Sequence, residues 1–275
     1  MEIRKKLEEL ASTAGMDFFG VAPIDRFSHA PAGHRPSDLL PKALSVISVG
    51  ARIPKGAIEA NNRAYEGLRH GIFSYMLFGY NHMNDRINGA LFNMGRFLED
   101  HAGAIAYPIP ASIPRDEEKL MGAMSNRHAA VCAGLAEFGW NGLAMRAKTG
   151  PRVRWGTLIT DKEIKPDPLY DGPKVCTGCK WCVQVCPMQA ISKEQGVELT
   201  IGPKTFRYAV LNKMRCRCGV SGFTRHTAGR TDLEIAEEMT AEEWLAVARK
   251  DDVWNKIERI ASMCGRCMIT CKAGA

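Results

Sequence analysis

One run of cysteines constrains this chain more than any other feature of its sequence. The run reads Cys176-Thr-Gly-Cys179-Lys-Trp-Cys182-Val-Gln-Val-Cys186-Pro187. Its spacing, C-x₂-C-x₂-C-x₃-C-P, is the one with which bacterial ferredoxins hold [4Fe–4S] clusters. In that pattern three cysteines wrap one cluster, and the fourth, which is followed by proline, serves a second cluster. The run therefore predicts two clusters in one protein.

A second group of cysteines supplies the remaining ligands. Cys264-Gly-Arg-Cys267-Met-Ile-Thr-Cys271 has the spacing C-x₂-C-x₃-C, and Cys216 and Cys218 lie between the two groups. Counting ligands assigns the first cluster to Cys176, Cys179, Cys182 and Cys271. The second cluster is assigned to Cys186, Cys264, Cys267 and one of Cys216 or Cys218, of which we favour Cys216.

Zinc is the alternative metal for such cysteines. Paired C-x₂-C motifs form Zn(Cys)₄ sites, but those sites do not require three cysteines at this spacing before Cys-Pro. Disulfides are disfavoured for ten cysteines in a chain that we expect to be cytoplasmic. Cys132, which lies among alanine and glycine residues, is predicted to be a buried, inert thiol.

Composition excludes several other classes of protein. The chain has 275 residues, of which 45% are hydrophobic and 24% charged, as in a typical globular protein. No apolar run reaches the roughly 18 residues that span a membrane, and the charged start lacks a signal-peptide core. We therefore expect a cytoplasmic protein without a membrane partner. The formal charge is +7. Two thiolate-held clusters at about −2 each would bring it to about +3, so it does not indicate nucleic-acid binding.

Periodicity predicts a mixed, α+β fold. We expect a helix and then a short strand within 1–22, a buried strand at 44–50, helices at 72–101 and 128–136, and a strand at 156–160. A Pro- and Gly-rich linker begins near Pro166, and nine of the ten cysteines follow it. This change predicts two domains, 1–165 and 166–275. The glycines of 134–142 follow a helix rather than a strand, which argues against a dinucleotide-binding loop.

Three segments carry a family resemblance. These are Ser125-Asn-Arg-His128 with its continuation to Leu143, the stretch from Gly150 to Asp161, and the first cysteine run. Together they resemble the epoxyqueuosine reductase and reductive dehalogenase superfamily. The resemblance implies a nitroreductase-like α/β N-terminal domain followed by a ferredoxin-like domain with two [4Fe–4S] clusters. It also implies a corrinoid (cobalamin) between the domains, close to Ser125, Asn126, His128, Gly139, Asn141 and Gly142. The alternative is that Ser125 or Asn126 caps a helix and that the glycines serve packing.

Three differences between this sequence and the family narrow the expected substrate and location. The chain stops just after Cys271, before the helical-repeat tail that helps epoxyqueuosine reductases hold tRNA, so tRNA is an unlikely substrate. The segment Lys119–Met124 has no carboxylate where those enzymes carry a proton donor. A twin-arginine signal of respiratory dehalogenases is absent. These departures predict a short, cytoplasmic relative that reduces an unidentified small molecule with electrons from a ferredoxin or flavodoxin.

A reductive site also needs a source of protons. Tyrosines and histidines can supply them, and we select His128 and Tyr107, with Tyr75 and Tyr80 as further candidates. Each of these residues has a core or surface role as its alternative. Arg152 and Arg154 could neutralise an anionic cofactor or substrate, or line a solvated strand.

The leading hypothesis is an iron–sulfur oxidoreductase that passes low-potential electrons through two clusters to a corrinoid between the domains. Two rivals stay open from the sequence. One is a non-enzymatic electron-transfer protein without a corrinoid, and the other is a flavin-dependent reductase.

Overall fold

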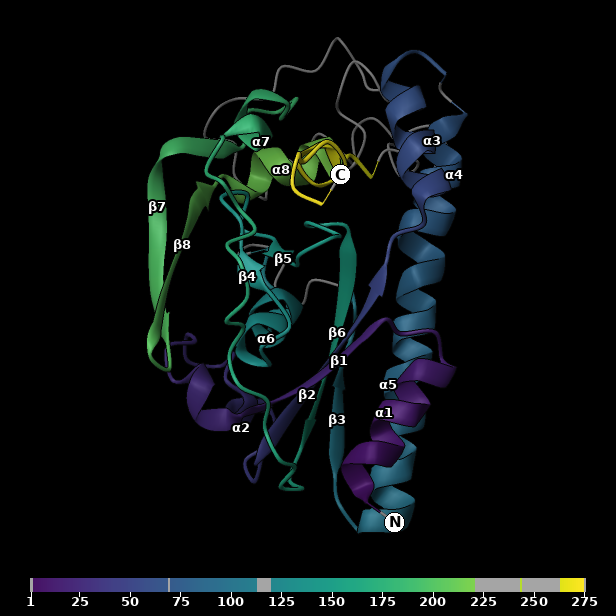
Figure 1. The fold of residues 1–275 in the computed structure, drawn as a ribbon, viewed down its shortest axis with the longest axis vertical. Helices are drawn as coiled ribbons and strands as arrows, with labels where there is room; N and C mark the ends of the chain where they lie inside the picture. Colours follow the sequence, from purple (N-terminus) through teal and green to yellow (C-terminus); the bar gives the residue numbers. More distant parts are fainter. Residues whose placement is uncertain (1, 69, 113–119, 221–242, 244–262, 275) are drawn as a thin grey trace.

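A four-stranded antiparallel sheet organises the fold. The computed structural model describes residues 2–68, 70–112, 120–220, 243 and 263–274. The strands of the sheet lie in the order β1-β2-β6-β3, and each neighbouring pair is antiparallel. Their bounds are β1 (Phe18–Pro23), β2 (Ser45–Arg52), β6 (Val153–Thr160) and β3 (Ala106–Ile109). The expectation of a mixed helix and sheet fold is confirmed (Figure 1).

The two central strands, β2 and β6, are the strands that the sequence predicts most directly. They pair from Ser45 opposite Thr160 to Arg52 opposite Val153. Neighbouring residues of β6 serve opposite faces, because side chains alternate along a strand. Leu158 belongs to one hydrophobic core and Ile159 to the other. The sheet is therefore covered on both sides, which explains its continuous apolar strands.

Helices cover the two faces. α1 (Ile3–Thr13) and α5 (His82–Ala102) lie together against one face, and the short α6 (Asn126–Cys132) packs on the other (Figure 1). α5 approaches β6 so closely that a Cβ on Gly156 would meet the Ile87 side chain at 2.3 Å. The α5 side holds the core around Leu7, Ile87, Leu91 and Leu98, and the α6 side the core around Ala129 and Val131.

The helix predicted over 72–101 is interrupted. α4 (Gly71–Ser74) leads into a π-helical segment, η2 (Tyr75–Asn81), which continues as α5. Gly79 is needed inside η2, since a Cβ there would meet the Tyr75 ring at 2.7 Å. π-helical turns are rare and occur frequently at functional sites. The preceding helix α3 (Lys55–Tyr65) is a further element that the sequence analysis did not predict.

Short elements occupy the segments expected to be loops. η1 (Ile24–Phe27) and α2 (Pro36–Leu39) lie between β1 and β2. β4 (Glu137–Phe138) and β5 (Ala144–Met145) form a small hairpin after α6. β3 contains Pro108, which is tolerated because β3 is an edge strand of the sheet.

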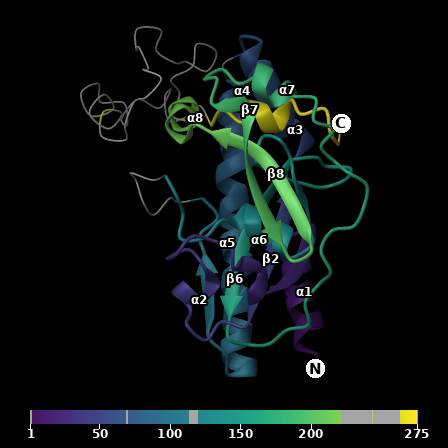
Figure 2. The ribbon, with the colours of Figure 1, turned by 90° about the vertical axis from the view of Figure 1, so that its left-hand side faces the viewer.

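Among the described residues after 165, the structure contains a long hairpin and three short helices. The hairpin joins β7 (Ile191–Ile201) to β8 (Lys204–Leu211) and lies over α6 in Figure 2. The helices are α7 (Trp181–Gln184), α8 (Lys213–Val220) and α11 (Arg266–Ile269). Within the described part of the chain, no helix combines the length and apolar character that a membrane span requires.

Contacts bridge the domain boundary that we predict near residue 165. The Asp167 carboxylate forms an ion pair with Arg4 at 2.9 Å and accepts a hydrogen bond from the Val21 backbone at 2.8 Å. Asp167 also donates its own backbone N–H to the Val21 carbonyl. These contacts fasten the segment after β6 to the edge of the sheet. The division into two domains stays a prediction.

Candidate metal centre

Two cysteine loops share one local conformation. Lys180 (φ 58°) and Gly265 (φ 62°) are both left-handed, and each immediately precedes a four-residue helix. These helices, α7 and α11, contact one another and contain Cys182 and Cys267. Each left-handed residue lies between two cysteines, so Cys179-Lys-Trp-Cys182 and Cys264-Gly-Arg-Cys267 are equivalent turns.

The first set of thiols, called set one below, contains Cys176, Cys179, Cys182 and Cys271. Burial, together with the neighbouring charges of Cys176, Cys271 and Cys179, raises the pKa of Cys182 to about 11. Burial also raises the pKa of Cys271, with additional repulsion from Cys176 and Cys179. Because these effects require short separations, they place the four thiols together. Cys179 is the exposed member of set one.

The second set, called set two, contains Cys186, Cys216, Cys264 and Cys267. Burial raises the pKa of Cys267 well above its usual value, and the charges of Cys216, Cys264 and Cys186 act in the same direction. Burial, together with repulsion from Cys264 and Cys186, raises the pKa of Cys216 to about 12. Cys182 also acts on Cys267, so the two sets are neighbours.

Cys216 and Cys218 are distinguished by their neighbours. Apart from burial, the groups that act on the Cys218 thiol are Arg217, Cys216 and its own backbone. The Cys216 thiol instead faces Cys264 and Cys186. The Cys216 thiol therefore lies nearer to the other thiols of set two than the Cys218 thiol does, and the choice of Cys216 as the eighth ligand stays a prediction.

The chemistry of both donor sets fits a cluster better than a single ion. All ten cysteines are free thiols, and burial with mutual repulsion disfavours a group of bare thiolates. A cationic metal centre offsets both effects. Zinc would require four sulfurs at about 2.3 Å from one ion. No group of three or more His, Cys, Asp or Glu side chains in the described residues is arranged to hold a single metal ion. A cubane, which spaces its ligands more widely, is compatible with that arrangement.

Hydrogen bonds reach the sulfur atoms from several elements. The backbone N–H of Trp140 donates to Cys176 Sγ at 3.3 Å, and that of Ala190 to Cys186 Sγ at 3.2 Å. The Tyr65 hydroxyl of α3 donates to Cys264 Sγ at 3.3 Å. Hydrogen bonds to ligand sulfurs tune the reduction potentials of iron–sulfur proteins. The Tyr65 contact was not predicted, because nothing local in the sequence connects α3 with the last cysteines.

Arg152 fixes the last cysteine loop. Its guanidinium donates to the carbonyl oxygens of Ile269 at 3.2 Å and Ala273 at 2.8 Å, and also to the carbonyl of Cys271. Burial lowers its pKa, while the Cys271 charge opposes that shift. Arg152, which the sequence offered as a neutraliser of a cofactor or substrate, therefore holds Cys271 in place.

Arg127 is a buried cation beside set two that the sequence analysis did not select. Its guanidinium donates to the Gly142 carbonyl. Burial lowers its pKa, while Tyr208, Cys216 and Cys267 counteract the shift. A buried guanidinium at this place offsets negative charge on set two. Its position within Ser125–His128 was the only sequence signal for it.

His128 is held in the interior. Its Nδ1 lies 2.7 Å from Ser125 Oγ, and its Nε2 lies 3.2 Å from the Tyr208 hydroxyl. Burial lowers its pKa to about 3, assisted by the charges of Arg127 and His29. The imidazole is thus neutral and connects α6 with β8. A catalytic role for His128 stays a prediction, and this geometry gives it a positioning role.

The other predicted cofactor residues lie along the same loop. Ser125 caps α6, and Asn141 donates from Nδ2 to the Cys267 carbonyl at 3.1 Å, next to set two. Asn126 donates to the Pro110 carbonyl, whereas its buried Oδ1 has no hydrogen-bond partner among the described residues. Gly139 and Gly142 face protein atoms: a Cβ on Gly139 would meet Met145 Sδ at 2.0 Å, and one on Gly142 would meet Arg127 at 3.2 Å. Packing explains these two glycines.

A group of polar side chains on η2, α5 and β6 also borders set two. Tyr75 is fully buried, and burial raises its pKa, with Arg154, Cys264 and Cys267 among the charges that act on it. The Arg154 guanidinium lies 4.0 Å from the centroid of the Tyr80 ring and donates to Asn84 Oδ1 at 2.8 Å. We call Tyr75, Tyr80, Asn84 and Arg154 the tyrosine–arginine group.

Tyr107 lies apart from that group. It is in β3 opposite Ile159 and packs against the hydrophobic core on the α6 side. Tyr75 belongs to the core on the α5 side. The structure therefore separates these two candidate proton donors and places Tyr75 beside the cysteines. A catalytic role for Tyr107 stays a prediction.

Comparisons with known proteins concern the first cysteine run and the fold. Residues 171–192 match a family model described as a 4Fe-4S binding domain. Tetrachloroethene reductive dehalogenase of Desulfitobacterium hafniense is 48% identical over 68 residues. Epoxyqueuosine reductase of Lactococcus garvieae is 26% identical over 212 residues, which is 69% of this chain.

Solved structures share the fold. Epoxyqueuosine reductase from Bacillus subtilis matches with a TM-score of 0.60 at 18% identity, over 99% of this chain and 65% of that one. A catabolic reductive dehalogenase matches with a TM-score of 0.54 at 17% identity, over 96% of this chain and 37% of that one. The resemblance to this superfamily is confirmed. The chain spans 56% of the curated epoxyqueuosine reductase and 12% of the tetrachloroethene dehalogenase.

Proposed function

We propose that the protein is a cytoplasmic iron–sulfur oxidoreductase with one [4Fe–4S] cluster in set one and another in set two. The observation that carries the proposal is the separation of eight thiols into two neighbouring groups of four, interleaved along the chain. When bound, such clusters accept and release single electrons. Ten free cysteines suit a reducing compartment, which supports the cytoplasmic location.

Exposure supports a direction for the electrons. Cys179 of set one is exposed, whereas all four thiols of set two are half-buried. Set two also lies next to the tyrosine–arginine group, since Cys264 and Cys267 act on Tyr75. Electrons would therefore enter at set one and leave from set two toward that group.

The tyrosine–arginine group is the best candidate for the reaction site. Arg154 offers a cation to a polar or anionic small molecule, and Tyr80, whose hydroxyl lies 2.5 Å from Ser112 Oγ, offers a proton donor. The Arg154–Asn84 hydrogen bond holds the guanidinium in place. We propose reduction of a small molecule here. One neighbouring epoxyqueuosine reductase was solved with a tRNA stem loop, so tRNA serves as a comparison substrate in any assay.

A corrinoid between the two cysteine sets and the nitroreductase-like domain, residues 1–165, is part of the proposal. The unpartnered Asn126 Oδ1 and the polar groups around Arg154 fit a polar ligand beside set two. A corrinoid would supply a low-valent cobalt centre there, and one structural neighbour concerns B12-dependent dehalogenation. The residues Ser125, Asn126 and Asn141 would line its pocket.

The test begins with anaerobically reconstituted protein. We expect about eight iron and eight sulfide per chain and EPR signals of two reduced clusters. Cys216→Ala should lose about four irons, whereas the matched control Cys218→Ala should retain all of them. A colourless protein that binds zinc stoichiometrically would refute the cluster assignment.

The corrinoid is tested separately. Titration of the reconstituted protein with cob(II)alamin should change its visible and EPR spectra, and Asn126→Leu should weaken that binding. A protein with both clusters and no spectral change would remove the corrinoid from the proposal. It would leave an electron-transfer protein or, if flavin binds instead, a flavin-dependent reductase.

A further inference from the structure

Cations and aromatic rings meet at the outer side of set one. The Lys180 ammonium lies over the Trp140 ring, and the Arg207 guanidinium lies 5.7 Å from the centroid of the same ring. The Lys272 ammonium lies 4.7 Å from the centroid of the Trp181 ring. We call these five residues the cation–aromatic surface.

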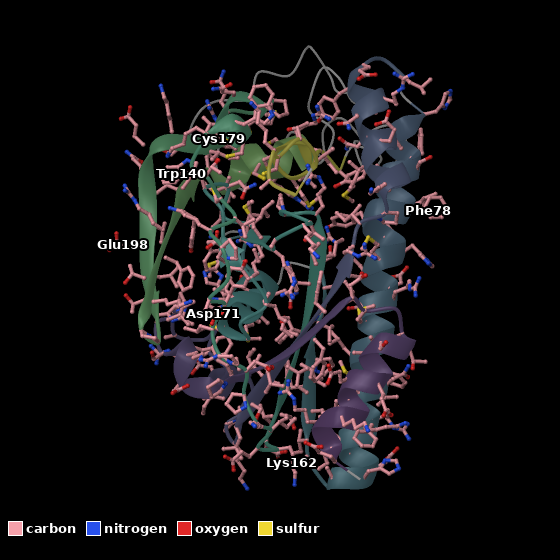
Figure 3. The ribbon with its side chains drawn as sticks, in the orientation of Figure 1. Phe78, Trp140, Lys162, Asp171, Cys179 and Glu198 are labelled. Atoms are coloured by element: carbon pink, nitrogen blue, oxygen red, sulfur yellow. The ribbon has the colours of Figure 1, made fainter. Side chains whose placement is uncertain are left out.

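Every ligand of set one is joined to this surface. The Trp140 backbone donates to Cys176 Sγ at 3.3 Å. Lys180 follows Cys179, Trp181 precedes Cys182, and Lys272 follows Cys271. Figure 3 shows Cys179 and Trp140 near the same end of the molecule, with Lys162 at the opposite end. The surface therefore lies beside the thiols of set one and includes the residue that follows the exposed Cys179.

We propose that the cation–aromatic surface docks an acidic electron-donor protein. The inference rests on the proposed function and names the partner of its entry site. Complementary charge steers such a partner and fixes its orientation. Tryptophan and arginine are the residues that most often anchor protein interfaces. In the docked complex the donor would be oxidised by one electron and the cluster proposed for set one would be reduced by it, with no covalent bond formed or broken.

Acidic residues lie at one side of the cation–aromatic surface. Glu194 is the carboxylate that acts on Lys180, whose ammonium also donates to the Lys193 carbonyl at 3.1 Å. Glu198 lies further along the hairpin, between Trp140 and Asp171 in the view of Figure 3. An acidic donor is expected to favour the basic side, away from these carboxylates. Neutralising Glu194 should then strengthen docking.

The experiment follows reduction of the anaerobic holoprotein by stopped flow. The probes are a reduced plant-type [2Fe–2S] ferredoxin, which is acidic, and reduced methyl viologen, a small cation. For Lys180→Glu/Arg207→Glu/Lys272→Glu we expect reduction by ferredoxin to slow by about tenfold or more at low salt and to lose its salt dependence. Reduction by methyl viologen should not slow. Lys162→Glu, a single charge reversal at the opposite end of the molecule, should behave like the wild type, and Glu194→Gln should be reduced faster by ferredoxin.

The outcomes separate the two proposals. Failure of the wild-type protein to bind iron or to be reduced by methyl viologen would refute the proposed function and this inference with it. A triple variant with both clusters that ferredoxin reduces at the wild-type rate would refute the docking surface alone. A rate that falls equally in Lys162→Glu would show a dependence on overall charge and would also refute it.

Discussion

Tyr65→Phe should lower the reduction potential of the cluster proposed for set two. The substitution removes the hydroxyl that donates to Cys264 Sγ at 3.3 Å. The ring remains, and with it the site over which the Arg266 guanidinium lies at 4.2 Å from the centroid. The change is thus close to the removal of one hydrogen bond. That bond stabilises the more negative, reduced state more than the oxidised state, so its loss disfavours reduction.

The magnitude follows from the strength of such bonds. A hydrogen bond to a charged group contributes about 1.5–3 kcal/mol. One added electron spreads over the cluster and its four sulfurs, so about a third of this energy, roughly 0.5–1 kcal/mol, should distinguish the two states. For one electron about 1.4 kcal/mol corresponds to 59 mV. The expected decrease is therefore about 20–40 mV.

The assay is an EPR-monitored redox titration in which both clusters are followed. Tyr170→Phe is the matched control, because the Tyr170 hydroxyl donates to the Pro173 carbonyl and to no thiol. It should leave both potentials unchanged. An unchanged or increased potential in Tyr65→Phe, or an equal shift of both clusters, would refute the reasoning.

Three further predictions concern the scaffold of the two sets. Gly265→Ala would place a Cβ 2.4 Å from the Tyr75 hydroxyl on a residue with φ 62°, so iron analysis should show loss of about half the iron. Gly178 is also left-handed, at φ 74°, but has open space around it, so Gly178→Ala should retain the iron. Arg152→Ala removes the hydrogen bonds to the carbonyl groups around Cys271. A chelator should therefore remove the cluster proposed for set one several-fold faster from Arg152→Ala than from Arg152→Lys. Equal rates would contradict the role of Arg152 in holding this loop. The pKa of His128 is about 3 in the folded protein and 6.5 in the unfolded chain. As the pH falls below 6.5, the unfolded chain binds a proton at His128 that the folded protein does not, so the folded protein loses stability. Between pH 7.5 and 5.5 this costs about 1.4 kcal/mol, and urea denaturation of His128→Asn should show a correspondingly weaker pH dependence; the same dependence in both proteins would refute it.

The grouping of the cysteines was the part of the candidate site that sequence reasoning reached most directly. Their spacing is a local property, and a count of four per cluster then predicts which distant cysteines belong together, with Cys216 and Cys218 left as alternatives. The central strands were equally visible, because β2 and β6 are buried on both faces and read as continuous apolar runs. For the cysteine runs and the central strands, the local sequence pattern alone indicates the structure that tertiary packing produces.

Other elements could not be read in this way. α3 buries Ala57, Asn61 and Ala64, which are small or polar and give almost no apolar periodicity. The hairpin of β7 and β8 packs only one, half-buried face on the protein, and β7 is buried only at its two end residues, so its apolar signal is weak, although Gly202-Pro203 marked its turn. The Tyr65–Cys264 bond joins residues 199 positions apart, and only tertiary packing brings them together.

The interleaving of the two sets has a consequence for biogenesis. Set one is complete only after Cys271 has been synthesised, and set two only after Cys264 and Cys267 have been synthesised. A nascent chain that ends shortly after Cys186 can therefore complete neither set. Both sets should remain incomplete until the last cysteine loop has emerged from the ribosome and its carbonyl groups have bonded to Arg152. Cluster insertion is then a late and nearly simultaneous event. An interruption of synthesis between Cys218 and Cys264 would yield a chain whose many thiols are exposed to oxidation.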